Sequence, residues 1–227
     1  MTITIREEQD AGNNTSQITF TLGAGTLTTD TLVLFHSDNF YTAADLLTPT
    51  GTAASTWTLR LTRDNGTNEH HIKVWTAPVT TGGASTVVTN STNVDNERYA
   101  AVFVLQSSPE FDTAAGAGDT SGSPNYVAPS VTPTAGKTDD LLLCGWATGL
   151  TTFSMPGGMT AYTERDVGGA ASYIVASEQL VSDAATGTRT ATGGTLHWAA
   201  ASLLMKTTAP PPPAPNLFVT RSNLQLR

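Results

Sequence analysis

Histidine is the side chain that most often does acid–base or metal chemistry near neutral pH, and the sequence has four of them. His70 and His71 are adjacent on an expected strand, so their rings point to opposite faces and cannot share one metal ion. His36 and Asp38 stand two residues apart at the end of another expected strand and could face the same way. Two ligands do not make a metal site. The sequence therefore predicts no metal ion, and exposed hairpin or strand-end positions for these histidines.

Oxygen-rich turns offer a second possible chemistry. Asp64, Asn65, Asn68 and Glu69 could bind calcium, but their order does not match the spacing of an EF-hand loop. The Asn-Gly pair that ends at Gly66 favours a type I′ hairpin turn instead, because both residues tolerate positive φ. We expect a hairpin here, with a return strand over 71–76.

Three features could mark a nucleophile or an acid–base pair. The GDTSGSP segment at 118–124 resembles a serine-protease motif with one residue inserted, but it lies in a Gly/Ser-rich stretch where such strings arise by composition. Cys144 lies inside an apolar expected strand, between leucines and Trp146, which predicts an inert buried thiol. Asp139 and Asp140 precede an expected strand, as Asp30 precedes another, so a turn explains all three. The sequence predicts a protein that is not an enzyme and has no cofactor.

Tryptophans could stack on sugars, and the chain has four. Trp57, Trp146 and Trp198 fall within expected strands, where core packing is the simpler interpretation. Trp75 precedes a turn at Ala77, which makes it the candidate for an exposed, sugar-stacking ring on a glycan-binding surface.

The C-terminal segment differs from the rest of the chain. Residues 207–215 are proline-rich, and since proline lacks an N–H and has a fixed φ, they predict an extended polyproline II spacer about 22 Å long. The spacer prolines are Pro210, Pro211, Pro212, Pro213 and Pro215. Residues 216–227 form a strand-like arm that cannot bury its own apolar side chains, so we expect it to dock on a partner. The docking residues are Leu217, Phe218, Val219, Thr220, Arg221, Leu224 and Leu226.

Composition indicates a rigid surface of small, hydroxylated residues with few charged ones. Charged residues make up 13% of the chain, against about 25% in an average globular protein. The arm contributes +2 to a net charge of −8, so the body alone carries −10, which disfavours nucleic-acid binding. No apolar run approaches the length of a membrane span, and the N-terminal MTITIREEQD lacks the pattern of a secretion signal. We expect synthesis in a cytoplasm without export.

Alternating apolar residues predict an all-β body with no helical period longer than two turns. A short helical turn at 42–47 and a loop over 10–16 are expected between strands, and 106–137 is expected to be irregular. The expected strands are 3–5, 18–22, 31–35, 57–61, 71–76, 87–89, 99–105, 127–131, 141–146, 161–165, 173–180, 188–192 and 198–205.

Four segments recur in the same order about 100 residues apart, which indicates a weak internal duplication. The pairs are 25–35 with 136–146, 57–64 with 159–166, the segments that start at 71 and 173, and 99–105 with 197–205. Two copies of a four- or five-stranded unit favour a jelly-roll-like β-sandwich of two Greek-key halves. The expected body is 1–206, with halves at about 25–106 and 136–206 and a crossover at 107–135. Two separate small domains are the alternative.

The segments HIKVWTAPVTTGGASTVVT and VAPSVTPTAGKTDDLLL, with the Asp-x-Leu-x-Leu strand, resemble a β-sandwich found among virion structural proteins of tailed actinobacterial phages. That family is described as decoration, minor capsid or minor tail proteins, and the likeness covers roughly 1–206. The resemblance implies assembly on a particle, with no catalytic residues to carry over.

Together these observations predict a structural protein of the virion surface, made in the host cytoplasm. The expected partners are sister subunits, in a homo-oligomer such as a trimer, and major capsid or tail proteins. Capsid decoration is preferred to a tail position, because exchange of arms between subunits commonly closes a symmetric cap. The alternatives are a minor tail or tail-tip protein, and a carbohydrate-binding module for host adsorption; an enzyme would need a carboxylate pair in a cleft.

Overall fold

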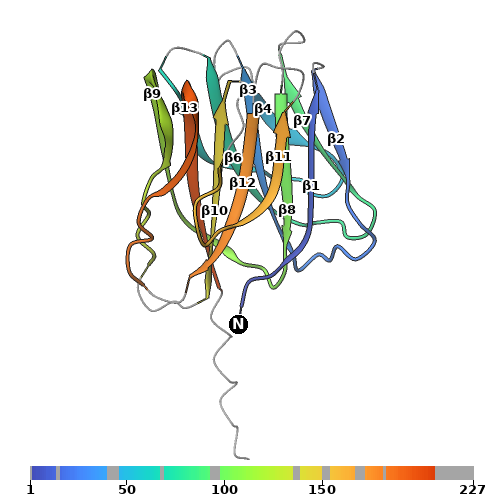
Figure 1. Cartoon of the computed structure of the whole chain (residues 1–227). Coiled ribbons are helices and arrows are strands. Elements are labelled where there is room, and N and C mark those ends of the chain that lie inside the picture. Colours follow the sequence, from blue (N-terminus) through green and yellow to red (C-terminus); the bar gives the residue numbers. More distant parts are fainter. Residues whose placement is uncertain are drawn as a thin grey trace, which may run out of the picture.

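A computed structural model describes residues 2–13, 16–39, 46–66, 69–92, 98–134, 139–149, 154–166, 172–180 and 183–207. The predicted all-β class is confirmed: the described residues form antiparallel strands and no helix, and the strands run along the long axis of the molecule (Figure 1). The arrangement is a β-sandwich with an additional small sheet. The spacer and the docking arm lie outside the described residues, which end at Thr207.

Two five-stranded sheets make up most of the body. The first sheet has the order β1-β8-β3-β6-β5, from β1 (Ile5–Asn13), β8 (Arg98–Leu105), β3 (Thr31–Asn39), β6 (His70–Pro78) and β5 (Thr58–Asp64). The second sheet has the order β11-β12-β10-β13-β9, from β11 (Thr160–Asp166), β12 (Ser172–Leu180), β10 (Asp140–Thr148), β13 (Arg189–Lys206) and β9 (Glu110–Ala128). A small sheet, β2-β7-β4, contains β2 (Gln17–Thr21), β7 (Thr86–Ser91) and β4 (Leu46–Thr50).

The central strand of the first sheet is buried on both faces. Side chains alternate along a strand, so Val33 and Phe35 point to the second sheet while Leu32 and Leu34 point to the small sheet. This double burial explains why the sequence TLVLF is apolar without alternation.

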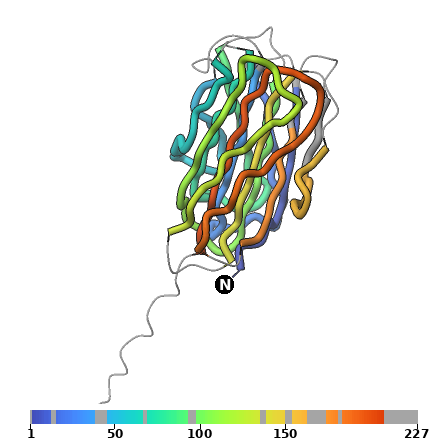
Figure 2. Tube along the Cα trace, turned by 60° about the vertical axis from the view of Figure 1, so that its left-hand side comes forward, coloured from blue at the N-terminus to red at the C-terminus, as the bar shows by residue number. Residues whose placement is uncertain are grey.

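The outer face of the second sheet is covered by its own strands. Bulges around Leu196 interrupt the pairing of β9 with β13. Beyond them, the C-terminal end of β9 and the N-terminal end of β13 fold back over that face (Figure 2). Tyr126 and Ala191 then pack with Leu142 and Trp146, and the Trp146 Nε1 donates a hydrogen bond to the Tyr126 carbonyl at 2.8 Å.

The two large sheets share one connectivity. Matching β8 with β13, β3 with β10, β6 with β12 and β5 with β11, as the sequence repeat pairs them, turns the first strand order into the second. Their irregularities match too: the pairing skips Arg60 in β5 and Tyr162 in β11, and likewise Arg6 in β1 and Asp112 in β9. These matches support the interpretation of repeated halves. The jelly-roll and Greek-key description stays a prediction.

The expectation that 106–137 is irregular is wrong for most of its length, because 110–128 form the long strand β9. The small residues that suggested a loop allow close packing instead. A Cβ added at Gly116 would lie 2.9 Å from the Arg63 Cβ, and one at Gly118 would lie 2.6 Å from the Asp64 carbonyl oxygen. Glycine here permits the edge strands β5 and β9 of opposite sheets to touch.

Three smaller expectations also differ. The loop expected over 10–16 is strand as far as Asn13, and of the helical turn expected over 42–47 Leu46 and Leu47 belong to β4, while 42–45 lie outside the described residues. The hairpin after β5 is present, but it is not a type I′ turn, since Gly66 has a φ of 84° and Asn65 has no positive φ. The Asp64 side chain accepts the Gly66 N–H instead.

Candidate functional site

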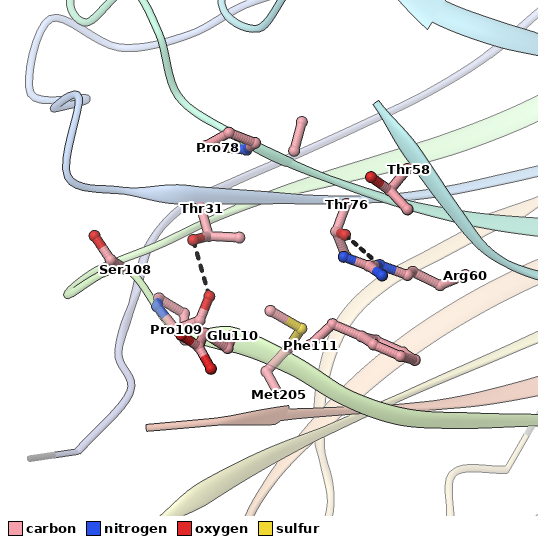
Figure 3. Close-up of a pocket in the computed structure, with 11 residues that line it drawn as sticks. Thr31, Thr58, Arg60, Thr76, Pro78, Ser108, Pro109, Glu110, Phe111 and Met205 are labelled. Atoms are coloured by element: carbon pink, nitrogen blue, oxygen red, sulfur yellow. Dashed lines mark hydrogen bonds between the residues drawn. The ribbon is translucent and has the colours of Figure 1, made fainter. Parts of the chain in front are cut away.

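Two grooves open between the edges of the large sheets, at the end of the molecule where β1 begins and β13 ends. The β5–β9 groove has a volume of about 520 Å³, and the β1–β11 groove has about 450 Å³. Residues of the β5–β9 groove are Thr31, Thr58, Arg60, Thr76, Ala77, Pro78, Ser108, Pro109, Glu110, Phe111 and Met205 (Figure 3). Residues of the β1–β11 groove are Thr2, Ile3, Thr4, Ile5, Leu141, Gly158, Thr160, Tyr162, Ser177, Glu178 and Gln179.

The grooves occupy equivalent places in the two sheets. Thr58 pairs with Thr76 before one bulge, and Thr160 pairs with Ser177 before the other, so Arg60 and Tyr162 are counterparts. By the same register Phe111 corresponds to Ile5, and Thr31 corresponds to Leu141. The β5–β9 groove therefore carries Arg60 and Thr31 where its counterpart has Tyr162 and Leu141.

Arg60 is the most distinctive residue of the β5–β9 groove. Its Nε donates a hydrogen bond to the Thr76 Oγ1 at 2.7 Å, and its guanidinium lies 4.4 Å from the centre of the Phe111 ring (Figure 3). No described residue accepts a hydrogen bond from either Nη atom. Burial lowers the pKa of the Arg60 guanidinium, which still titrates far above neutral pH. The group is an oriented cation whose two Nη atoms have no hydrogen-bond acceptor among the described residues.

The turn before β9 forms the opposite wall of this groove. Ser107 and Ser108 have φ values of 74° and 48°, which non-glycine residues seldom adopt. Hydrogen bonds hold the turn: the Ser108 N–H and Oγ donate to the Thr29 carbonyl at 2.8 and 2.6 Å, and the Thr31 Oγ1 donates to the Pro109 carbonyl at 3.0 Å. Strained backbone held in this way is often found at binding sites.

The chemistry of the groove suits binding better than catalysis. Its described lining contains one carboxylate, the exposed Glu110, and no histidine or cysteine. A hydroxyl without a neighbouring base is a poor nucleophile. The arrangement can hold an anion and hydroxyl groups.

The histidines expected at exposed positions are buried. His36 and His71 are fully buried and His70 is 5% exposed, because the ends of β3 and β6 lie inside the sandwich. Burial, then the charges of Arg98 and Lys73, lower the pKa of His36 to about 3, and burial lowers that of His70 to about 4 although Glu69 opposes the shift. Within the described ranges no group of three or more His, Cys, Asp or Glu side chains could hold a metal ion.

The other candidate residues have structural settings. Cys144 is buried as expected, and burial raises the pKa of its thiol to about 12. Asp30 binds Arg6 at 2.8 Å, and Asp140 accepts the Thr207 N–H at 3.3 Å. Asp119 of the GDTSGSP segment binds the backbone N–H and hydroxyl of Ser121 within β9.

The expectation of an exposed Trp75 ring is wrong. Trp75 is 5% exposed and belongs to the core between the first and small sheets, because β6 continues to Pro78 and the small sheet covers that face. The ring is therefore not available to stack on a sugar.

A search of family models, curated proteins and solved structures found no match to this chain. In the part of the chain that the structure describes, no helix is long and apolar enough to span a membrane. The docking-arm residues lie outside the described residues, so their role stays a prediction.

Sequence reasoning did not single out Arg60 or Phe111. A lone arginine in an alternating strand resembles any solvent-facing residue, and Phe111 lay in a segment expected to be irregular. The repeat did contain one signal, because its alignment of 57–64 with 159–166 already places Arg60 opposite Tyr162.

Proposed function

We propose that this chain is a non-enzymatic structural protein on the exterior of a tailed-phage virion, most simply a capsid decoration or minor capsid protein. Its body would be displayed outward, and residues 216–227 would anchor it to a sister subunit or to the shell. The virion location is inferred from the sequence resemblance, and the anchoring role is inferred from the composition of residues 216–227.

One structural observation supports the proposal most: β13 leaves the body at one end of a long sandwich, beside the start of β1 (Figure 1). The proline spacer predicted from the sequence would start from that end and hold the arm away from the body. An end-on attachment leaves the long sides of the sandwich exposed.

The body also has the packing and backbone pairing expected of a stable structural protein. Its apolar residues are used in three clusters between and outside the large sheets, and backbone pairing extends over long strands. The acidic body, at −10, complements an arm that carries Arg221 and Arg227 and no acidic residue.

The arm would add affinity by pairing its backbone with an exposed sheet edge and placing alternate side chains in pockets. Phe218→Asp in the full chain would put a charge at the centre of the apolar run and should abolish attachment to particles. Ser222→Asp adds the same charge at a polar position of the same arm and should attach normally.

Co-sedimentation with particles that lack the protein measures both variants. Equal attachment by the Phe218→Asp chain and the unaltered chain would refute anchoring by the arm. A chain that ends after Thr208 should keep the melting temperature of the full chain and lose attachment, which separates anchoring from folding.

A further inference from the structure

We propose that the β5–β9 groove binds a hexuronate, a sugar ring that carries one carboxylate, with Arg60 as the anchor for that carboxylate. The proposal is independent of the virion role and of the arm, since it rests only on residues of the body.

The first argument is the state of the Arg60 cation. Arg6 and Arg189 differ from Arg60 in being paired with acids, Arg6 with Asp30 at 2.8 Å and Arg189 with Glu178 at 2.6 Å. Arg60 has no acid within ion-pair distance among the described residues. Its planar fork is fixed by Thr76 and the Phe111 ring, so both Nη atoms can meet a carboxylate without further ordering of the side chain.

The second argument is the size and lining of the groove. A volume of about 520 Å³ lies in the range of small-molecule sites, roughly 300 to 1,000 Å³. Figure 3 shows Thr31, Thr58 and Pro78 on one wall of the groove and Phe111 and Met205 on the other, so hydroxyls and apolar surface both line it. A sugar ring likewise presents both hydroxyls and C–H groups.

The charge of the molecule limits the ligand. The body carries −10 and Glu110 stands at the rim of the groove, so a strongly acidic protein would be repelled. A ligand with one carboxylate next to neutral hydroxyls is repelled less than an acidic protein would be, and its carboxylate can still bind the Arg60 guanidinium. A free sugar or the end unit of a glycan satisfies this condition.

The β1–β11 groove is an internal control that the fold provides. It has similar volume and equivalent strands, but Tyr162 replaces the arginine and Ile5 replaces the phenylalanine. It should not bind a uronate.

The test is an NMR titration of the full chain at low ionic strength with glucuronic acid, methyl β-glucuronide and methyl β-glucoside. We expect the two carboxylates to bind with Kd of about 1 mM, a value typical of a small polar ligand with one charged anchor, and to shift the Met205 methyl signal. The neutral glucoside should bind at least about 10-fold more weakly. Binding of methyl β-glucuronide without binding of free glucuronic acid would identify the end unit of a glycan as the source of the ligand. Binding of both glucuronic acid and methyl β-glucuronide would allow either a free sugar or a glycan end unit.

Variants assign the site. Arg60→Met should weaken glucuronide binding at least about 10-fold, whereas Arg60→Lys should retain part of it because a point charge lacks the fork. Glu110→Gln should strengthen binding two- to threefold by removing repulsion at the rim, and Tyr162→Met should leave it unchanged. If Arg60→Met does not fold, Glu110→Gln still tests the site, because Glu110 is exposed and its substitution should not disturb folding.

The proposal is overturned if neither carboxylate binds at about 20 mM, well above the expected Kd. Equal binding of glucoside and glucuronide would overturn it as well, as would an unchanged affinity in both Arg60→Met and Glu110→Gln.

Discussion

Gly118 of β9 lies against the backbone of Asp64 in β5, so that a Cβ at residue 118 would be 2.6 Å from the Asp64 carbonyl oxygen. The two residues belong to edge strands of opposite sheets. Their contact brings the edges of the two sheets together on the side of the sandwich that also holds the β5–β9 groove.

Gly118→Ala should therefore destabilise the fold. The added methyl would push β5 and β9 apart, and overpacking of this kind costs about 1 to 3 kcal/mol. Chemical denaturation measures the free energy of unfolding. Gly25→Ala is the control, because no atom lies within 4 Å of a Cβ there, and equal stability of the two variants would contradict the close contact.

Acid should weaken the body between pH 6.5 and pH 5. The pKa values of His36 and His70 are lowered to about 3 and about 4, so the unfolded chain binds more protons in this window and stability falls as the pH falls. The loss is on the order of 3 kcal/mol for both groups together. Melting temperatures across the window measure it.

His36→Leu isolates one of the two contributions. Neither ring nitrogen of His36 hydrogen-bonds to a described residue, so the variant loses no such bond. It should show about half the pH dependence of the unaltered chain. An identical slope would mean that His36 does not contribute.

Cys144 should be unreactive in the folded protein. Burial raises the pKa of its thiol to about 12, so very little thiolate exists at pH 8 and no reagent reaches it. A colorimetric thiol assay should detect one thiol in denaturant and almost none without it. Rapid labelling of the native protein would contradict this burial.

Trp75→Ala should lower stability rather than abolish a sugar interaction. The ring is buried between the first and small sheets, and truncation of a buried aromatic side chain costs about 3 to 5 kcal/mol. Denaturation checks the cost. Unchanged stability would show that the ring is not part of the core.

Much of the fold could be predicted from the sequence, because burial on both faces leaves apolar runs such as 31–35 and 141–146. The long strand β9 could not, because Gly116 and Gly118 fit its close contact with β5, which only the folded sheets create. Trp75 was misread for a similar reason, since the sheet that covers it is distant in sequence.

The β5–β9 groove could not be predicted from the sequence as the fold could. Its walls come from β5, β6 and the turn before β9, and the contact of Arg60 with Phe111 exists only after the two sheets pack. Residues that touch across sheet edges leave no spacing signal along the chain.

The central claim is that the chain is a virion part anchored by its arm, and a density map of a particle that carries the protein tests it most directly. The map should show the sandwich outside the shell, with continuous density for 216–227 along a neighbouring subunit. A body attached through the sides of its sheets, with its β13 end directed into solvent, would contradict the account.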